Sequence, residues 1–217
     1  MADDGLLGYH SALALLGSPR SGDRRPLDDQ RRSAVARAAL SRLVATRAGI
    51  DPAAVTLDHD EHGRPLIEGS ALAVSIAHAA EFVACAVSER AVGVDLERTD
   101  RPEADAALAK RFCTPAERRQ LDNLPVDERQ QALVRLWTRK EAVAKALGLG
   151  VAIPFEQLDV SANHPVIEGV KKPSLRIADL TAGPSNYTIA IATKSRRPNI
   201  QAQLFTKGQA TRMHIKP

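Results

Sequence analysis

Two long amphipathic segments, each ending at a glycine, constrain most strongly what this chain can fold into. Residues 28–50 read as a helix with acids in its first turn, an apolar face that includes Leu40 and Leu43, and Gly49 as its stop. Residues 128–147 read as a second helix, stopped by Gly148. Each apolar face has to be buried, and a sheet can cover it.

Short segments with strand character follow each helix. The best candidates have small and β-branched residues between turn residues, and E-F-V-A-C-A-V-S (81–88) resembles N-Y-T-I-A-I-A-T (186–193). The expected strands are 55–58, 72–76, 82–87 and 91–97 in the first series and 155–160, 174–177 and 187–193 in the second. Residues 100–108 would cross between the series, and residues 194–217 are expected to be irregular.

These patterns predict an α+β fold of two similar halves, residues 1–105 and 106–217. Each half would be a small, mainly antiparallel sheet packed on a long helix. A pseudo-twofold would relate the halves, with the ligand site in the groove between them. A chain that already supplies both sides of the groove is expected to be a monomer.

Composition narrows the class of protein. The sequence is 44% hydrophobic and 26% charged, as in soluble globular proteins, and its 3% aromatic content disfavours a nucleic-acid reader built on stacking. The N-terminus lacks the basic region of a signal peptide, and its apolar piece, 13–16, is too short to cross a membrane. Two cysteines cannot form a disulfide framework, so we expect a reducing, cytoplasmic location without membrane partners.

The positive charge is concentrated near the N-terminus. Between Arg20 and Arg47 there are eight arginines and three aspartates. Such a segment attracts phosphates, nucleic acid or an acidic protein, although a solvated helix face explains it equally well.

Two carboxylates end the predicted strand 91–97. Asp95 and Glu97 are two positions apart, so both point to one face, while Val94 and Leu96 point to the other. Oxygen ligands without a neighbouring His or Cys favour a hard ion such as Mg²⁺. A solvent-facing strand end, balanced by Arg98, is the alternative.

The second helix carries a lysine where an apolar residue is expected. Lys140 lies on the apolar stripe, four positions after Leu136 and four before Ala144. Such a lysine must reach solvent, lose its charge or meet an anion. Glu141 is adjacent to it and would supply a third carboxylate, so this helix face is expected to meet an anionic ligand and its metal.

Five motifs in order give the chain a resemblance to a known family. They are H-G-R-P (62–65), S-I-A-H-A (75–79), G-V-D-L-E (93–97), R-F-C-T-P-A-E (111–117) and W-T-R-K-E-A-V-A-K (137–145). Together they resemble the signature of 4′-phosphopantetheinyl transferases of the pseudo-dimeric, Sfp-type class. The resemblance covers residues 30–150 well and the remainder only by its strand pattern.

The resemblance implies an activity and a metal site. Enzymes of this family transfer 4′-phosphopantetheine from coenzyme A to a serine of an apo carrier protein and release adenosine 3′,5′-bisphosphate. Asp95, Glu97 and Glu141 would hold Mg²⁺, or Mn²⁺, against the pyrophosphate. Glu141 is the favoured general base, with Asp95 and Lys145 also catalytic; Glu117 and metal-bound water are the alternatives for the base.

The resemblance also implies ligand contacts. Residues expected to bind coenzyme A are Arg24, Arg31, Arg37, Arg64, His78, Lys140 and Lys145, with Arg25 a further helper. Ala77 and Ala79 stand where the family has serines beside the histidine, so two potential phosphate contacts are missing. The carrier protein is expected to be acidic and to dock along one edge formed by residues 112–124.

Two other functions remain open. A different Mg²⁺-dependent enzyme, such as a nucleotide hydrolase, would share the carboxylates, but the chain has no P-loop of the G-x-x-x-x-G-K-[ST] form. A basic nucleic-acid-binding module would explain the arginines but not the acidic pair or Lys140.

Overall fold

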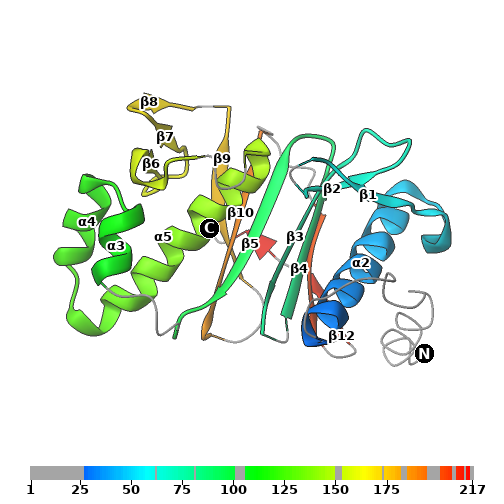
Figure 1. The fold of residues 1–217 in the computed structure, drawn as a ribbon, viewed down its shortest axis with the longest axis horizontal. Coiled ribbons are helices and arrows are strands. Elements are labelled where there is room, and N and C mark those ends of the chain that lie inside the picture. Colours follow the sequence, from blue (N-terminus) through cyan, green and yellow to red (C-terminus); the bar gives the residue numbers. More distant parts are fainter. Residues whose placement is uncertain are drawn as a thin grey trace.

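The computed structural model describes residues 27–61, 63–80, 82–100, 106–149, 153–172, 174–181, 185–194, 201–206, 209–212 and 214–215. Figure 1 shows two long helices at the outside with strands between them. No helix in the described ranges is long and apolar enough to cross a membrane.

The first part of the chain contributes one helix and five strands. Helix α2 spans Leu27–Ala48 and ends at Gly49, which has a φ of 70°. After a 3-10 turn at Pro52–Ala54, the strands are β1 Leu57–His59, β2 Pro65–Ile67, β3 Ala73–Ala79, β4 Phe82–Ser88 and β5 Val92–Arg98.

The second part begins with three helices. They are α3 Ala106–Phe112, α4 Pro115–Asp122 and α5 Val126–Leu147. Thr114 and Glu117 form a capping box at the start of α4. After a 3-10 turn at Phe155–Gln157, the strands are β6 Leu158–Asp159, β7 Val166–Ile167, β8 Val170–Lys171, β9 Arg176–Thr181, β10 Tyr187–Thr193, β11 Gln201–Thr206, β12 Gln209–Arg212 and β13 His214–Ile215.

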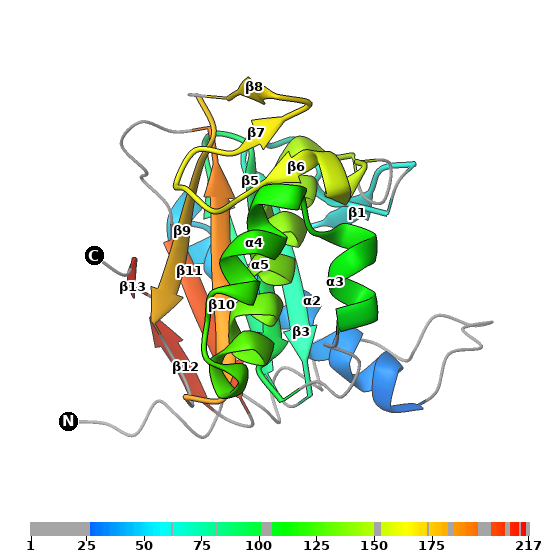
Figure 2. The ribbon, with the colours of Figure 1, turned by 90° about the vertical axis from the view of Figure 1, so that its left-hand side faces the viewer.

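The two main sheets lie face to face and each is covered by one long helix (Figures 1 and 2). One sheet has the order β12-β11-β4-β3 and the other β13-β9-β10-β5. Inward-facing residues such as Ala84, Val94 and Ile191 form the core between the sheets. Residues pointing the other way pack against α2 from β3 and β4, and against α5 from β10. The result is four layers: helix, sheet, sheet, helix.

Each series has three long strands, β3, β4 and β5 in the first and β9, β10 and β11 in the second. The third long strand of each series pairs in the sheet of the other series. Strand β5 follows β4 in the chain but pairs antiparallel with β10, with Asp95 opposite Ala190. Strand β11 follows β10 but pairs antiparallel with β4, with Gln203 opposite Cys85. The chain division at residues 105 and 106 stays a prediction, and the strand pairing crosses it twice.

Strand β5 approaches helix α5 unusually closely at Gly93. A Cβ added there would lie 2.0 Å from the backbone oxygen of Ala142 and 2.4 Å from the backbone nitrogen of Ala146. No L side chain fits at such distances, so a glycine is required for this packing. Because side chains alternate along a strand, Asp95 and Glu97 face α5 together with Gly93.

The structure confirms the predicted helices and most strands to within a few residues. The expectation for residues 194–217 is wrong, because β11, β12 and β13 lie there. These strands have weak patterns of their own; β11 is specified by hydrogen bonding to the edge of β4. The predicted crossover at 100–108 lies partly outside the described residues, and α3 begins at Ala106.

Replacing Gly93 by alanine should destabilise the fold by about 3 kcal/mol, at the upper end of ordinary overpacking, because two backbone atoms block the new methyl group. Urea denaturation followed by circular dichroism measures the loss. Gly69→Ala is the control, since it adds left-handed strain at a φ of 67° with nothing within 4 Å, and should lose only about 1 kcal/mol. Equal stabilities for the two variants would show that the close approach is not real.

Candidate functional site

The residues of two predicted motifs meet where β5 lies on α5. The Asp95 carboxylate is almost fully buried, and its Oδ1 accepts a hydrogen bond from Lys145 Nζ at 2.7 Å. The Lys145 side chain is 31% exposed, so one side of this ion pair faces solvent. Asp95 is therefore fixed within the protein, while the Lys145 ammonium is accessible to a ligand.

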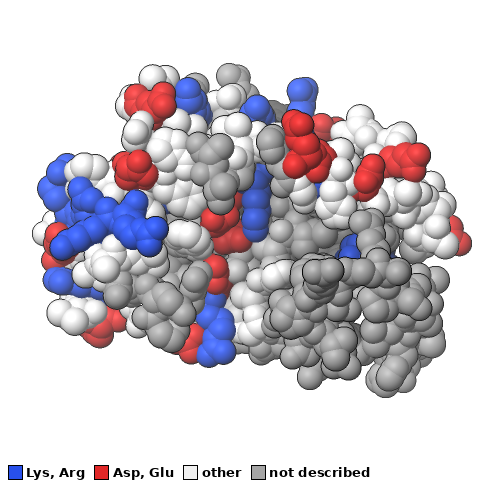
Figure 3. All heavy atoms as spheres, viewed as in Figure 1, with Lys and Arg blue, Asp and Glu red and all other residues white. Residues whose placement is uncertain are grey.

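Two further carboxylates lie on the same two elements. Glu97 follows Asp95 on the face of β5 toward α5, and Glu141 precedes Lys145 by one helical turn; both are half-buried. Figure 3 shows acidic and basic side chains next to each other at the centre of the molecule, where α5 and β5 meet in Figure 1. Asp95, Glu97, Glu141 and Lys145 thus lie on two elements that pack against each other.

These carboxylates fit a hard metal ion by chemistry but are not assembled as a metal cluster. Oxygen donors of this kind suit Mg²⁺. In the described part of the chain, however, no three His, Cys, Asp or Glu side chains are close enough together to hold an ion. At Asp95 a metal ion would compete with Lys145 Nζ for Oδ1.

Arg64 lies at the end of α5, the helix that carries Lys145. It belongs to the turn between β1 and β2, where its backbone N–H and Nε both donate to the carboxylate of Asp60, at 2.8 and 3.0 Å. Its guanidinium reaches across to Gly148, directly after the last residue of α5. The structure therefore brings Arg64 near the helix that carries Glu141 and Lys145.

The other predicted coenzyme A contacts lie elsewhere or outside the described side chains. His78 is exposed near the end of β3. Arg37 is half-buried on α2, the outer layer on the opposite side of the molecule from α5. Arg31 lies in the backbone of α2, and its side chain is outside the described residues; Arg24 and Arg25 are outside them altogether.

Lys140 does not point toward the predicted phosphate site, which corrects the sequence-based expectation. Its side chain is fully buried, and Nζ forms an ion pair of 2.8 Å with Oε2 of Glu117. The same ammonium donates to the backbone oxygens of Phe155 and Leu158. The lysine on the apolar stripe does meet an anion, but that anion is a glutamate of the protein's own interior.

Glu117, the alternative general base, is equally committed to contacts inside the protein. Its Oε2 also accepts from the Thr114 backbone N–H, and Oε1 accepts from the Val160 N–H, both at 2.9 Å. No part of Glu117 is exposed. Burial lowers the pKa of Lys140, and the negative charge of Glu117 opposes that change. Through their contacts the two residues link α4, α5 and the segment around β6.

Cys113 belongs to the same interior region. Its side chain is buried in the core cluster, and desolvation together with the charge of Glu117 raises its pKa to about 12. A thiol with such a pKa remains protonated and is a poor nucleophile. Cys113 therefore serves as a packing residue in this cluster.

Sequence reasoning missed two residues that position the site. Gly93 allows β5 to lie on α5, and its signals were a glycine inside a strand pattern and its place as the first residue of the G-V-D-L-E motif. Ser75 is buried, and its hydroxyl accepts a hydrogen bond of 3.0 Å from the Val94 N–H, which joins β3 to β5. Ser75 is the first residue of the predicted S-I-A-H-A motif.

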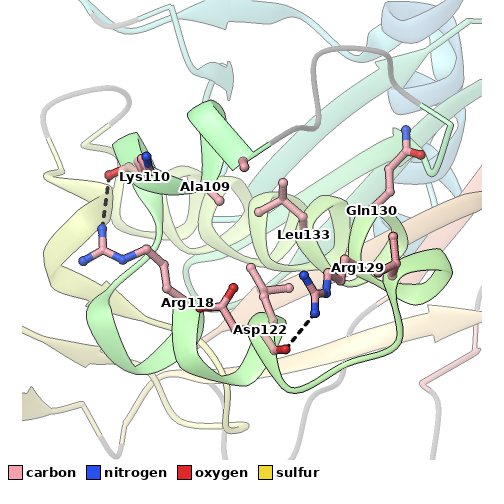
Figure 4. A pocket seen from close by; sticks show the side chains of 10 residues that line it. Ala109, Lys110, Arg118, Asp122, Arg129, Gln130 and Leu133 are labelled. Atoms are coloured by element: carbon pink, nitrogen blue, oxygen red, sulfur yellow. Dashed lines mark hydrogen bonds between the residues drawn. The ribbon is translucent and has the colours of Figure 1, made fainter.

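A cavity of about 360 Å³ lies between α3, α4 and the beginning of α5 (Figure 4). Its walls include Ala109, Leu121, Val126 and Leu133. Around it are three cations, Lys110, Arg118 and Arg129, and one acid, Asp122. Arg118 donates to the Lys110 backbone oxygen and Arg129 to those of Asp122 and Leu124, so the two arginines are held in place.

The segment that builds the site matches a known family. Residues 91–192 match the family model described as the 4′-phosphopantetheinyl transferase superfamily. This segment contains β5, α5 and all three candidate carboxylates. Over these residues the chain is similar to that superfamily. The resemblance inferred from the motifs is thus confirmed.

Curated proteins named 4′-phosphopantetheinyl transferases are also similar to parts of this chain. The 4′-phosphopantetheinyl transferase HetI of Nostoc is 34% identical over 140 residues, which are 62% of this chain and 58% of HetI. A 4′-phosphopantetheinyl transferase of Bacillus subtilis is 31% identical over 123 residues, 56% of this chain and 54% of that protein. The chain thus spans little more than half the length of these curated relatives.

A solved structure overlaps in part. The holo-[acyl-carrier-protein] synthase of Neisseria meningitidis aligns with a TM-score of 0.39 at 18% identity, over 48% of this chain and 95% of its own.

Lys140→Met should destabilise the protein by about 3–5 kcal/mol, because it leaves the Glu117 carboxylate buried without its cation. Chemical denaturation measures this change. The double variant Glu117→Leu/Lys140→Met removes both charges and should recover part of the loss, although the backbone N–H groups of Thr114 and Val160 lose their acceptor. A Lys140→Met protein as stable as the wild type would rule out the buried ion pair.

Proposed function

We propose that this protein transfers 4′-phosphopantetheine from coenzyme A to a serine hydroxyl of an apo carrier protein. The observation that carries the proposal is the Asp95–Lys145 ion pair, which joins the G-V-D-L-E and W-T-R-K-E-A-V-A-K motifs within the segment that matches the superfamily. A catalyst for this reaction has to bring cations and a positioned hydroxyl to a phosphorus shielded by negative oxygens. The α5–β5 junction offers carboxylates for a metal ion and a half-exposed lysine for a phosphate.

Asp95, Glu97 and Glu141 are the residues that would hold Mg²⁺, or Mn²⁺. The bound ion would neutralise charge on the pyrophosphate as bonds form and break at phosphorus. Two of these carboxylates share one face of β5, and the third lies on the helix packed against that face.

Glu141 is the proposed general base. It is half-buried on α5, whereas Glu117 is enclosed and saturated with hydrogen bonds. Lys145 is the proposed phosphate contact on the same helix, with Arg64 at the helix end and His78 on β3 as further contacts. Lys140 is left out, because its ammonium is fully engaged inside the protein.

The two series of elements are proposed to be halves related by a pseudo-twofold, with coenzyme A between them in a monomer. Helices α2 and α5 each have 22 residues and each end at a glycine of positive φ. In both series the second long strand, β4 or β10, pairs with the strand before it and with the third strand of the other series. Such reciprocal pairing is what a duplication with exchanged strands would produce.

The cavity beside α4 is proposed as part of the carrier-protein surface. It lies along the predicted edge 112–124 and combines an apolar lining with a surplus of positive charge. Figure 3 shows basic side chains gathered at the end of the molecule that α3 and α4 occupy in Figure 1. An acidic carrier helix that presents one apolar side chain matches both properties.

Asp95→Asn should reduce transfer at least 100-fold, because it removes the charge that holds Lys145 and any metal ion. Incubation with coenzyme A, Mg²⁺ and an apo carrier, followed by mass spectrometry of the carrier, measures transfer. Asp100→Asn is the matched control, since this exposed aspartate follows the same strand but pairs only with Arg98 among the described contacts, and should retain full activity.

The same assay decides the function. If the wild-type protein modifies no carrier from fatty acid, polyketide or peptide pathways, the transferase proposal is wrong. Hydrolysis of nucleotides under those conditions would indicate a different Mg²⁺-dependent phosphate enzyme.

Lys110→Glu should raise the KM for the carrier protein about five- to tenfold and leave the KM for coenzyme A unchanged, because it reverses one charge beside the cavity. Raising the salt concentration should shrink the difference. Lys194→Glu is the control, an exposed lysine after β10 and outside this cavity lining. Equal effects of the two charge reversals would place the docking surface elsewhere.

A further inference from the structure

The two long helices end in nearly the same way. At the end of α5 the N–H of Leu149 donates to the oxygen of Ala144, and the N–H of Gly148 donates to that of Lys145, both at 3.2 Å. At the end of α2 the N–H groups of Ile50 and Gly49 both donate to the oxygen of Ala45, at 3.1 and 2.8 Å. Gly148 and Gly49 have φ values of 69° and 70°, so both need the left-handed freedom of glycine.

Only one of these two glycines has a neighbour over its Cα. A Cβ added at Gly49 would meet nothing within 4 Å. A Cβ added at Gly148 would lie 3.0 Å from Nη1 of Arg64 and 3.4 Å from its Cζ. Helix-end geometry alone therefore explains Gly49, whereas Gly148 also makes room for a guanidinium group.

The Arg64 guanidinium is fixed on one side and open on the other. Nε donates to Oδ2 of Asp60 at 3.0 Å, and the Arg64 backbone is tied to the same carboxylate. An arginine side chain has five N–H donors, one on Nε and four on Nη1 and Nη2. Among the described residues, none accepts a hydrogen bond from the four on Nη1 and Nη2 of Arg64. With 43% of the side chain exposed, these donors can reach a ligand.

We propose that Gly148 is a positioning residue: its missing side chain lets Arg64 rest on the end of α5, where the guanidinium faces a phosphate group of coenzyme A. The inference rests on the proposed function and extends it to a residue outside the predicted site. The turn that ends α5 would then set two cations at once, because Gly148 donates to the backbone oxygen of Lys145, whose ammonium holds Asp95. A forked, fixed donor suits phosphate better than a mobile ammonium.

A double-mutant cycle tests the contact without any assumption about function. Gly148→Ala and Gly49→Ala introduce equal left-handed strain, but only Gly148→Ala crowds an arginine. In urea denaturation Gly148→Ala should therefore lose more stability than Gly49→Ala, and the excess should disappear when Arg64 is replaced by alanine. An excess that persists without Arg64 would overturn the proposed contact.

Kinetics test the positioning. Arg64→Ala should raise the KM for coenzyme A about tenfold and Gly148→Ala about fivefold, both with little change in kcat, since a charged hydrogen bond to the ligand is lost or displaced. The variant Gly148→Ala/Arg64→Ala should match Arg64→Ala, and Gly49→Ala should match the wild type.

The outcomes separate the inference from the function. If the wild type transfers phosphopantetheine but Gly148→Ala raises the KM equally with and without Arg64, the positioning role is wrong while the function stands. If the wild type neither binds coenzyme A in calorimetry nor modifies a carrier, the proposed function fails and the positioning role with it. The stability cycle then shows whether the contact is purely structural.

Discussion

The close packing of β5 against α5 at Gly93 determines where every candidate catalytic group lies. A glycine there lets strand backbone touch helix backbone, and the next residue on that strand face is Asp95. With an ordinary strand-to-helix spacing, the Asp95 carboxylate would lie farther from Lys145 than the 2.7 Å observed. The geometry of the candidate site is thus a consequence of backbone packing.

Neighbouring residues of helix α5 contribute to two different regions, the protein interior and the candidate site. Successive side chains on a helix are rotated by about 100°, so Lys140 enters the interior while Glu141 lies at its edge. Lys140 joins α4 and β6 through Glu117, and Lys145 joins β5 through Asp95. The two lysines have the same chemistry and opposite roles: one anchors the helix, and the other meets the solvent.

Much of the layout could be predicted from the sequence because it follows local rules. Helix stops at Gly49 and Gly148, the capping residues Thr114 and Glu117, and the alternation around Asp95 are all encoded within a few positions. The partner of Lys140 could not be predicted. The position of Lys140 on the apolar face of α5 indicates that its charge has to be met, but not that Glu117 supplies the anion. Likewise, β11 takes its place from the exposed edge of β4, which only the tertiary fold reveals.

The reciprocal placement of β5 and β11 also orders the events of folding. The sheet built on β4 lacks one of its central neighbours until residues 201–206 have been synthesised, so the first half of the chain emerges from the ribosome with an open edge. Until then, β4 presents unpaired backbone groups to any other strand. Strand β4 thus gains its second neighbour only when β11, more than 100 residues later in the chain, is available to pair with it.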